Sequence, residues 1–232
     1  AEQGHAAAQH GLGAMYDNGQ GVAPDHSMAA QWYRKAALQG VVVAQYKLGA
    51  MFDAGRGLRQ NPSEAAKWYR MAAEKGYVLG QYRLGVLYAQ GRGVPRNDAE
   101  AAAWYGKSAA QGHAFAQNSL GVMFEKGRGV AKDVEQAAAW YLKAAEQGHA
   151  MAQYNLGVKY ARGIGVTRDA ALAAKWFGDA ARQGFARAQN NLGVIYEKGR
   201  GVSKSEKDAA KWYRKAALQG HAKVQMKIAN FY

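Results

Sequence analysis

The sequence predicts an all-α solenoid built from a repeated pair of helices. Three observations lead to this fold class: an unbroken period of 36 residues, helical spacing of apolar residues within each period, and glycines at fixed places between the helical segments. The chain has 232 residues, and 49% of them are hydrophobic, so it can bury a core and does not have the composition of a disordered chain. We therefore expect a single repeat domain over residues 1–232.

The dipeptide Leu-Gly marks the period, because it recurs every 36 residues with no insertion or deletion. Its copies are Leu12-Gly13, Leu48-Gly49, Leu84-Gly85, Leu120-Gly121, Leu156-Gly157 and Leu192-Gly193. The repeats so defined, numbered one to six, lie near residues 4–39, 40–75, 76–111, 112–147, 148–183 and 184–219. A lone terminal helix is expected at 220–232. No chance origin is credible for such regularity.

The first half of each repeat predicts a helix, here called helix A. In repeat one, Ala8, Leu12 and Tyr16 fall on one helical face. The glycine after each leucine lets the second helix of the same repeat approach closely. A glutamine also recurs on helix A, and its regularity indicates a structural hydrogen bond that holds a loop or a helix end. Its copies are Gln9, Gln45, Gln81, Gln117, Gln153, Gln189 and Gln225.

A Gly-x-Gly pair follows each helix A, as at Gly55 and Gly57. A phosphate-binding loop needs a preceding strand and a single special turn, whereas these pairs recur six times between helices. We interpret the glycines as residues that supply the backbone angles of the connecting loop.

The second half of each repeat predicts helix B. An Asp, Asn or Ser stands where the helix begins and is favoured as an N-cap there. These residues are Asp25, Asn61, Asn97, Asp133, Asp169 and Ser205. Each helix B carries a tryptophan, such as Trp32, among core-facing alanines, and we expect it to pack between neighbouring repeats. A glycine such as Gly40 closes each repeat, at a position that suits a left-handed residue.

The pattern Ala-x-x-Leu-Gly-x-x-Tyr, then Gly-x-Gly-Val, a capping Asp or Asn, Ala-x-x-Trp-Tyr-x-x-Ala-Ala and a closing Gly resembles the Sel1-like repeat, a relative of the tetratricopeptide repeat. The resemblance covers the whole chain. It implies a right-handed superhelix with helix A on the concave side, and a bacterial adaptor or scaffold that binds partner proteins. It also implies export to the periplasm or secretion, and some similar proteins are immunity proteins against antibacterial effectors. The chain has no cysteine, so it does not resemble the disulfide-linked branch of the family.

The ends of the chain carry two further expectations. Residues 1–4 match the end of a helix B, so we expect sequence before residue 1. In the terminal helix Ala229 replaces the repeated glycine, so we expect Tyr232 at or near the natural C-terminus. No apolar run approaches the roughly 18 to 20 residues that cross a bilayer.

No group of residues predicts catalysis, a cofactor or a metal ion. Cysteine is absent, and the carboxylates lie singly on helix surfaces. Histidines such as His113 and His149 share one repeat position, so they are at least 36 residues apart, and none has metal-ligand spacing. We therefore expect a non-enzymatic protein.

A binding function is expected where the repeats differ on an exposed face. One helix-A position carries mostly tyrosine and asparagine, which combine contact area with adaptable hydrogen bonds. This row, the tyrosine/asparagine row, consists of His10, Tyr46, Tyr82, Asn118, Tyr154 and Asn190. Phe115 and Met151 add an apolar centre. Together these residues predict a groove that holds a partner protein or peptide, although some of them could instead pack on the next repeat.

The positive charge forms a second candidate surface. The formal net charge is +14, which favours an acidic partner. The arginines between the loop glycines would lie along one edge as a basic ridge; they are Arg56, Arg92, Arg128 and Arg200. Two alternatives stay open beside the protein scaffold. One is an immunity protein with a cognate effector toxin, and the other is a binder of nucleic acid or another anionic polymer, which the lack of a nucleic-acid motif disfavours.

Overall fold

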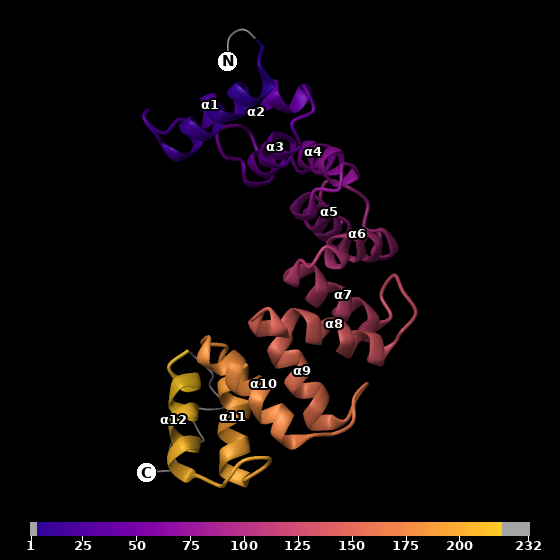
Figure 1. Cartoon of the computed structure of the whole chain (residues 1–232), viewed down its shortest axis with the longest axis vertical. Helices are drawn as coiled ribbons and strands as arrows, with labels where there is room; N and C mark the ends of the chain where they lie inside the picture. Colours follow the sequence, from indigo (N-terminus) through magenta and orange to yellow (C-terminus); the bar gives the residue numbers. More distant parts are fainter. Residues whose placement is uncertain (1–3, 220–232) are drawn as a thin grey trace. The chain divides into compact units, whose positions relative to one another are not determined.

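The computed structural model describes residues 4–219, which contain twelve α-helices and no strand (Figure 1). The chain divides into two compact units, residues 1–113 and 114–232, and each is described by itself. The first unit contains α1 (Ala6–Asn18), α2 (His26–Leu38), α3 (Val42–Ala54), α4 (Pro62–Glu74), α5 (Val78–Gln90) and α6 (Asp98–Ala110). The second contains α7 (Ala114–Lys126), α8 (Val134–Glu146), α9 (Ala150–Arg162), α10 (Ala170–Arg182), α11 (Ala186–Lys198) and α12 (Glu206–Ala217). The odd-numbered helices are the predicted helices A and the even-numbered ones the helices B.

The helix boundaries lie where the capping residues predict them. All six predicted N-caps of the helices B accept a backbone N–H with their side chains; the carboxylate of Asp25, for example, accepts from Met28 at 2.9 Å. The closing glycines adopt a left-handed backbone, with φ of +88° at Gly40 and +85° at Gly148. The predicted closing glycine Gly220 and the terminal helix at 220–232 lie outside the described residues.

Each helix A packs closely against the helix B of its own repeat. A Cβ atom on Gly49 would lie 2.8 Å from Cδ1 of Tyr69, so only glycine lets the ring of α4 lie against the backbone of α3. The same close approach recurs at the other described Leu-Gly pairs, for instance between Gly121 and Tyr141. The predicted reason for the repeated glycine is therefore confirmed.

The tryptophans join neighbouring repeats. Trp68 of repeat two belongs to the core cluster that contains Tyr33 and Ala36 of repeat one. Trp176 of repeat five packs in the same way with Tyr141 of repeat four. The tryptophans that recur at this repeat position thus pack between neighbouring repeats, as the sequence predicts.

The repeated glutamines connect successive repeats by hydrogen bonds. The side-chain amide of Gln153 donates to the carbonyl of Ala145, near the end of α8, at 3.1 Å. The amide of Gln183, which follows α10, donates to Gln153 Oε1 at 2.8 Å and to the carbonyl of Gly148 at 2.9 Å. These bonds satisfy carbonyls that a helix end leaves without a helical partner. The predicted structural role is confirmed at described glutamines such as Gln45, Gln81, Gln153 and Gln189, whereas Gln225 lies outside the described residues.

Candidate functional site

Apart from the buried Asn118, the tyrosine/asparagine row lies half-buried on the helices A, and its tyrosine rings contact aromatic residues of the same repeat and of the next one. The ring centroid of Tyr46 is 5.7 Å from that of Tyr69 and 5.2 Å from that of Tyr77. Three repeats further on, Tyr154 has the same environment, 5.7 Å from Phe177 and 5.2 Å from Phe185. Both tyrosines are therefore held by aromatic packing and remain partly exposed.

The other members of the row differ in how much surface they offer. Tyr82 lies 4.8 Å from the ring of His113, and His10 lies 5.7 Å from that of Tyr33. Asn118 is buried, and its Oδ1 accepts a hydrogen bond from Asn155 at 3.1 Å. Asn118 therefore offers little contact area, whereas Asn190 is half-buried like the tyrosines.

Phe115 and Met151 are large apolar side chains that stay exposed. Their exposed fractions are 56% and 48%, and the ring of Phe115 meets that of His149 edge-on at 4.6 Å. Both residues lie in the second unit, near the starts of α7 and α9. This exposure is consistent with the apolar contact that the sequence predicts there, although exposed apolar residues also occur singly on many surfaces.

A carboxylate on helix A is held by a tyrosine and by a loop arginine in the first unit. Asp17 accepts from the hydroxyl of Tyr33 at 3.5 Å and forms an ion pair with Arg56, 39 residues later. Burial, together with the neighbouring Asp17, raises the pKa of Tyr33 to about 12, so the hydroxyl keeps its proton and remains a donor. Asp53 and Arg92 form the same ion pair one repeat further on.

Repeat four uses a lysine in place of the arginine. Ile164 stands at the repeat position of Arg56 and Arg92, and Glu125 instead forms an ion pair with Lys159 at 2.6 Å. The side chain of Lys159 is only 3% exposed, because it occupies a core position that holds methionine, leucine or isoleucine in other repeats. The hydroxyl of Tyr141 also donates to Glu125, at 2.6 Å.

Repeat five has neither the carboxylate nor the hydroxyl. Ala161 stands at the position of Asp17 and Asp53, and Phe177 stands where other repeats have tyrosine. Arg200 keeps the arginine of the next loop, yet among residues 4–219 no carboxylate pairs with it. Repeat five therefore keeps Arg200 but lacks both the carboxylate and the tyrosine hydroxyl of repeats one and two.

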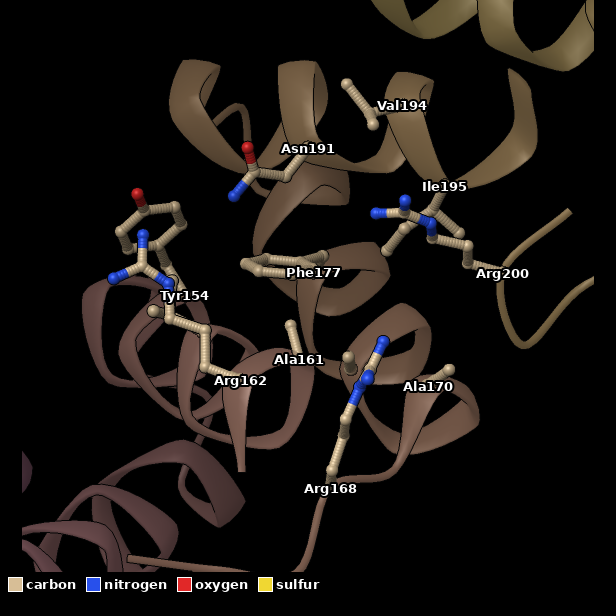
Figure 2. Close-up of a pocket in the computed structure, with 12 residues that line it drawn as sticks. Tyr154, Ala161, Arg162, Arg168, Ala170, Phe177, Asn191, Val194, Ile195 and Arg200 are labelled. Atoms are coloured by element: carbon tan, nitrogen blue, oxygen red, sulfur yellow. The ribbon is translucent and has the colours of Figure 1, made fainter. Parts of the chain in front are cut away.

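A pocket with a volume of about 320 Å³ opens at this place in the second unit (Figure 2). Its apolar lining includes Tyr154, Val158 and Phe177. Figure 2 shows the guanidinium groups of Arg162, Arg168 and Arg200 around the ring of Phe177. No acidic residue lines this pocket, which we call the arginine pocket.

The first unit has a pocket of about 510 Å³ at the equivalent position, three repeats earlier. Tyr46, Ala50 and Tyr69 line it where Tyr154, Val158 and Phe177 line the arginine pocket. Asp53 and Arg92 lie in this pocket too and form their ion pair there. A pocket thus lies at equivalent helix-A positions in both units. Only the pocket of the first unit contains a carboxylate.

The predicted basic ridge is accordingly not a uniform row of available cations. Arg56 and Arg92 are ion-paired, although 49% and 44% of their side-chain surface remains exposed. Arg128 is half-buried, and Arg200 lines the arginine pocket. The signal for these ion pairs in the sequence is the 39-residue spacing between the aspartate and the arginine, as between Asp17 and Arg56. Because this spacing exceeds one 36-residue period, a comparison of positions within a single repeat does not reveal it.

Two further properties of the described part of the chain bear on its function. Within residues 4–219, no three histidine or carboxylate side chains come together in a way that could hold a metal ion. None of the described helices is both long enough and apolar enough to cross a membrane.

The paired helices and the 36-residue period together define an α-helical repeat protein of the solenoid class. The chain belongs to the Sel1 repeat family. The family model matches six consecutive segments, residues 6–41, 42–77, 78–113, 114–149, 150–185 and 186–221. Proteins of this family are generally non-enzymatic repeat scaffolds.

Solved structures with high similarity come from bacterial Sel1 proteins. A protective antigen present in uropathogenic Escherichia coli strains is 41% identical with a TM-score of 0.96; the match covers 100% of this chain and 50% of that one. The chain thus spans about half the length of that antigen. A Sel1 repeat protein from Oxalobacter formigenes is 36% identical over 92% of this chain and 86% of its own, with a TM-score of 0.81.

An immunity protein from Pseudomonas aeruginosa is 22% identical over 92% of this chain and 81% of its own. Its TM-score is 0.51, so this likeness shows the fold alone. The comparison with curated proteins gives no match.

Proposed function

We propose that the chain is a scaffold that binds a segment of a partner protein along its helices A. The observation that carries this proposal is the pair of equivalent pockets on α3 and α9. In each, a tyrosine held by aromatic packing borders a pocket whose lining combines apolar and charged side chains. Rigid aromatic side chains beside adaptable polar groups are typical of surfaces that bind peptides, because little entropy is lost on contact.

The residues of the tyrosine/asparagine row contribute unequally to this proposal. Tyr46 and Tyr154 line the pockets and are its strongest members. Asn118, being buried, supports the structure around Met151 more than it contacts a partner. The partner is proposed to be acidic, because the chain carries a net charge of +14.

Site-specific photocrosslinking tests which face binds. Benzoylphenylalanine is introduced at Ala50 on α3 or at Val158 on α9, both of which line the pockets. Control positions are Ala103 on α6 and Ala139 on α8, which are exposed on helices B. The proposal predicts the same crosslinked protein from both pocket positions and none from the controls. Crosslinks from the helix-B positions alone would contradict it.

A narrower proposal is that the partner is one toxic effector, which the chain neutralises as an immunity protein. It is supported by the fold likeness to the Pseudomonas aeruginosa immunity protein and by nothing more specific. It requires a one-to-one complex that inhibits the effector, and it goes with the proposed location in the periplasm or outside the cell. Cell fractionation and an inhibition assay with the crosslinked protein test both parts.

Binding of an anionic polymer is the remaining alternative. The internal pairing of Arg56 and Arg92 supports it less than an open ridge of four arginines would. It predicts that a short oligonucleotide binds and that the charge reversals R56E and R92E abolish binding. A protein scaffold predicts that the oligonucleotide does not bind, and that these changes weaken a partner segment only through the first-unit pocket, which Arg56 and Arg92 line.

A further inference from the structure

We propose that the arginine pocket binds a side-chain carboxylate of an acidic partner segment, with Arg200 as its principal contact. This inference rests on the proposed scaffold function and specifies the chemistry of the partner at one place. It starts from an arrangement that is complete in repeats one and two and lacks its carboxylate in repeat five. In repeats one and two the position on helix A holds a carboxylate that pairs with the loop arginine of the next repeat, as in Asp17 with Arg56.

In repeat five three features occur together. Ala161 removes the carboxylate, Phe177 removes the hydroxyl that would donate to it, and Arg200 keeps the guanidinium. The pocket extends over these residues, and Arg200 has no carboxylate partner within residues 4–219. The space that an internal carboxylate fills in the first unit is thus open to an external one.

The charge around the pocket supports the same ligand. Arg162, Arg168 and Arg200 are the charged residues of its lining, whereas the equivalent pocket of the first unit also contains the carboxylate of Asp53. None of the described carboxylates pairs with Arg162 or Arg168. Guanidinium groups bind carboxylates through two parallel hydrogen bonds, and three such groups around one pocket repel one another until an anion enters.

The floor of the pocket indicates which carboxylate it suits. Val158, Phe177 and Ile195 form an apolar surface directly beside the arginines. A ligand that is both acidic and apolar fits this lining better than inorganic phosphate or a sugar-phosphate backbone does. We therefore assign the site to an Asp or Glu side chain that neighbours an apolar residue in an extended segment of the partner.

The sharpest variant restores the carboxylate that the repeat lacks. A161D should place an acidic group beside Arg200, as Asp53 lies beside Arg92, and so occupy the site from within the protein. R200Q removes the principal contact by a different change. A89D is the matched control, because Ala89 holds the same repeat position on α5 but lies outside the arginine pocket. Circular dichroism melting checks that each variant is folded.

The probe is a phage-displayed library of random 12-residue peptides, selected on the wild-type chain. The selected peptides are then synthesised with amidated C-termini, and their affinities are measured by fluorescence anisotropy. We expect them to share an acidic residue beside an apolar one. Affinity should fall at least about tenfold in A161D and in R200Q, and should be kept in A89D. Replacing the shared acidic residue by its amide should cause a similar loss.

Any of the following results would overturn the inference. Selected peptides without a common acidic residue, or equal binding to A161D, would show that the pocket does not bind a carboxylate, while the proposed scaffold function would stand. Binding of the oligonucleotide dT12 in place of peptide would assign the arginines to another anion. Failure to select any peptide, together with no crosslink from Ala50 or Val158, would reject both the scaffold function and this inference.

Discussion

The glycine of each described Leu-Gly pair lies too close to an aromatic ring to carry a side chain without a shift of that ring or its helix. A Cβ atom on Gly121 would lie 2.8 Å from Cδ1 of Tyr141 and 3.2 Å from the carbonyl oxygen of Ala137. The carbonyl belongs to the backbone of α8, so the clash could be relieved only by separating two helices. By contrast, a Cβ on Gly106, in the middle of α6, would meet nothing within 4 Å.

These two glycines give opposite predictions for the same substitution. G121A should lower the free energy of unfolding by about 2–3 kcal/mol, because it overpacks the contact between α7 and α8. G106A should raise it by about 0.5–1 kcal/mol, because alanine is the better helix former where space is free. Urea denaturation followed by circular dichroism measures both. A stabilised G121A variant would contradict the described packing.

The ion pair of Glu125 and Lys159 combines one buried group with one partly exposed group. The side chain of Lys159 is 3% exposed and that of Glu125 is 37% exposed. Removing the carboxylate leaves a buried ammonium group without a counter-charge, whereas removing the lysine leaves a carboxylate that water and Tyr141 still solvate.

E125Q should therefore destabilise the chain more than K159M does. We expect E125Q to cost about 1–2 kcal/mol, a value kept low because Glu125 is partly exposed to solvent. K159M should cost less, and the double variant should recover most of the loss caused by E125Q. Thermal melts of the three variants measure this order, and equal losses in both single variants would contradict it.

The same pair has a defined pH dependence. Burial raises the pKa of Glu125, but the hydrogen bonds from Lys159 and Tyr141 outweigh this effect and hold it below the ordinary value of 4.5. A carboxyl whose pKa is lowered by folding stabilises the folded state above its unfolded pKa and loses that contribution as the pH falls through the folded pKa. The stability difference between wild type and E125Q should thus stay constant above a pH of about 5 and shrink below about 4.5.

Among the helix pairs, the glutamine bonds are complete in most repeats but incomplete at Gln45. One repeat position at or just beyond the end of helix B holds glutamine in five repeats, as Gln39, Gln111, Gln147, Gln183 and Gln219, and Lys75 in repeat two. Lys75 donates to the carbonyl of Gly40 at 3.0 Å. Within the described residues, Oε1 of Gln45 has no hydrogen-bond donor, although Gln45 is fully buried.

K75Q should consequently stabilise the chain. A glutamine amide at this position can donate both to the Gly40 carbonyl and to Gln45 Oε1, as Gln111 does to Gly76 at 3.1 Å and to Gln81 at 2.8 Å. Satisfying one buried acceptor is worth about 1 kcal/mol. The reverse change, Q111K, is the matched control and should destabilise by a similar amount. Differential scanning calorimetry of both variants tests the expected opposite signs.

How far the sequence predicts each helix pair depends on which residues interact. The N-caps, the closing glycines and the glycine under the aromatic ring act within one repeat or across one boundary, and the period reveals them directly. Lys159 could not be predicted, because its position reads as apolar in other repeats and its partner is 34 residues away. Asn118 was predicted on the open row, yet its hydrogen bond to Asn155 of the next repeat buries it.

In the chain as a whole, the period predicts the fold class and leaves the binding surface largely open. Repeated residues build the stack, so they dominate any pattern in the sequence. The arginine pocket instead depends on departures from the pattern, at Ala161 and Phe177, and on side chains that three different elements bring together. The significance proposed for Ala161 and Phe177 can be recognised only once the contacts of the equivalent residues, such as the ion pair of Asp53 with Arg92, are known.

The same regularity makes the fold tolerant of the loss of one complete repeat. Within each of the two units, each helix packs chiefly on the helices before and after it, so the stability of such a stack is close to a sum of repeat and interface terms. Deleting residues 42–77 joins Val41 to Val78, where an equivalent helix A begins. Arg92 should then pair with Asp17 and Gln81 with the Ala37 carbonyl, because they hold the repeat positions of Arg56 and Gln45.

We expect this deletion variant to fold with unchanged helical content per residue and a Tm only a few degrees lower, owing to the shorter stack. Deleting residues 42–59 is the control, because it removes α3 and places α4 directly after α2. That control leaves the apolar face of α4 without a helix A, so it should aggregate or lose helicity. Circular dichroism of both variants distinguishes the outcomes, and a loss of cooperative melting in the whole-repeat deletion would show that coupling extends beyond neighbouring helices.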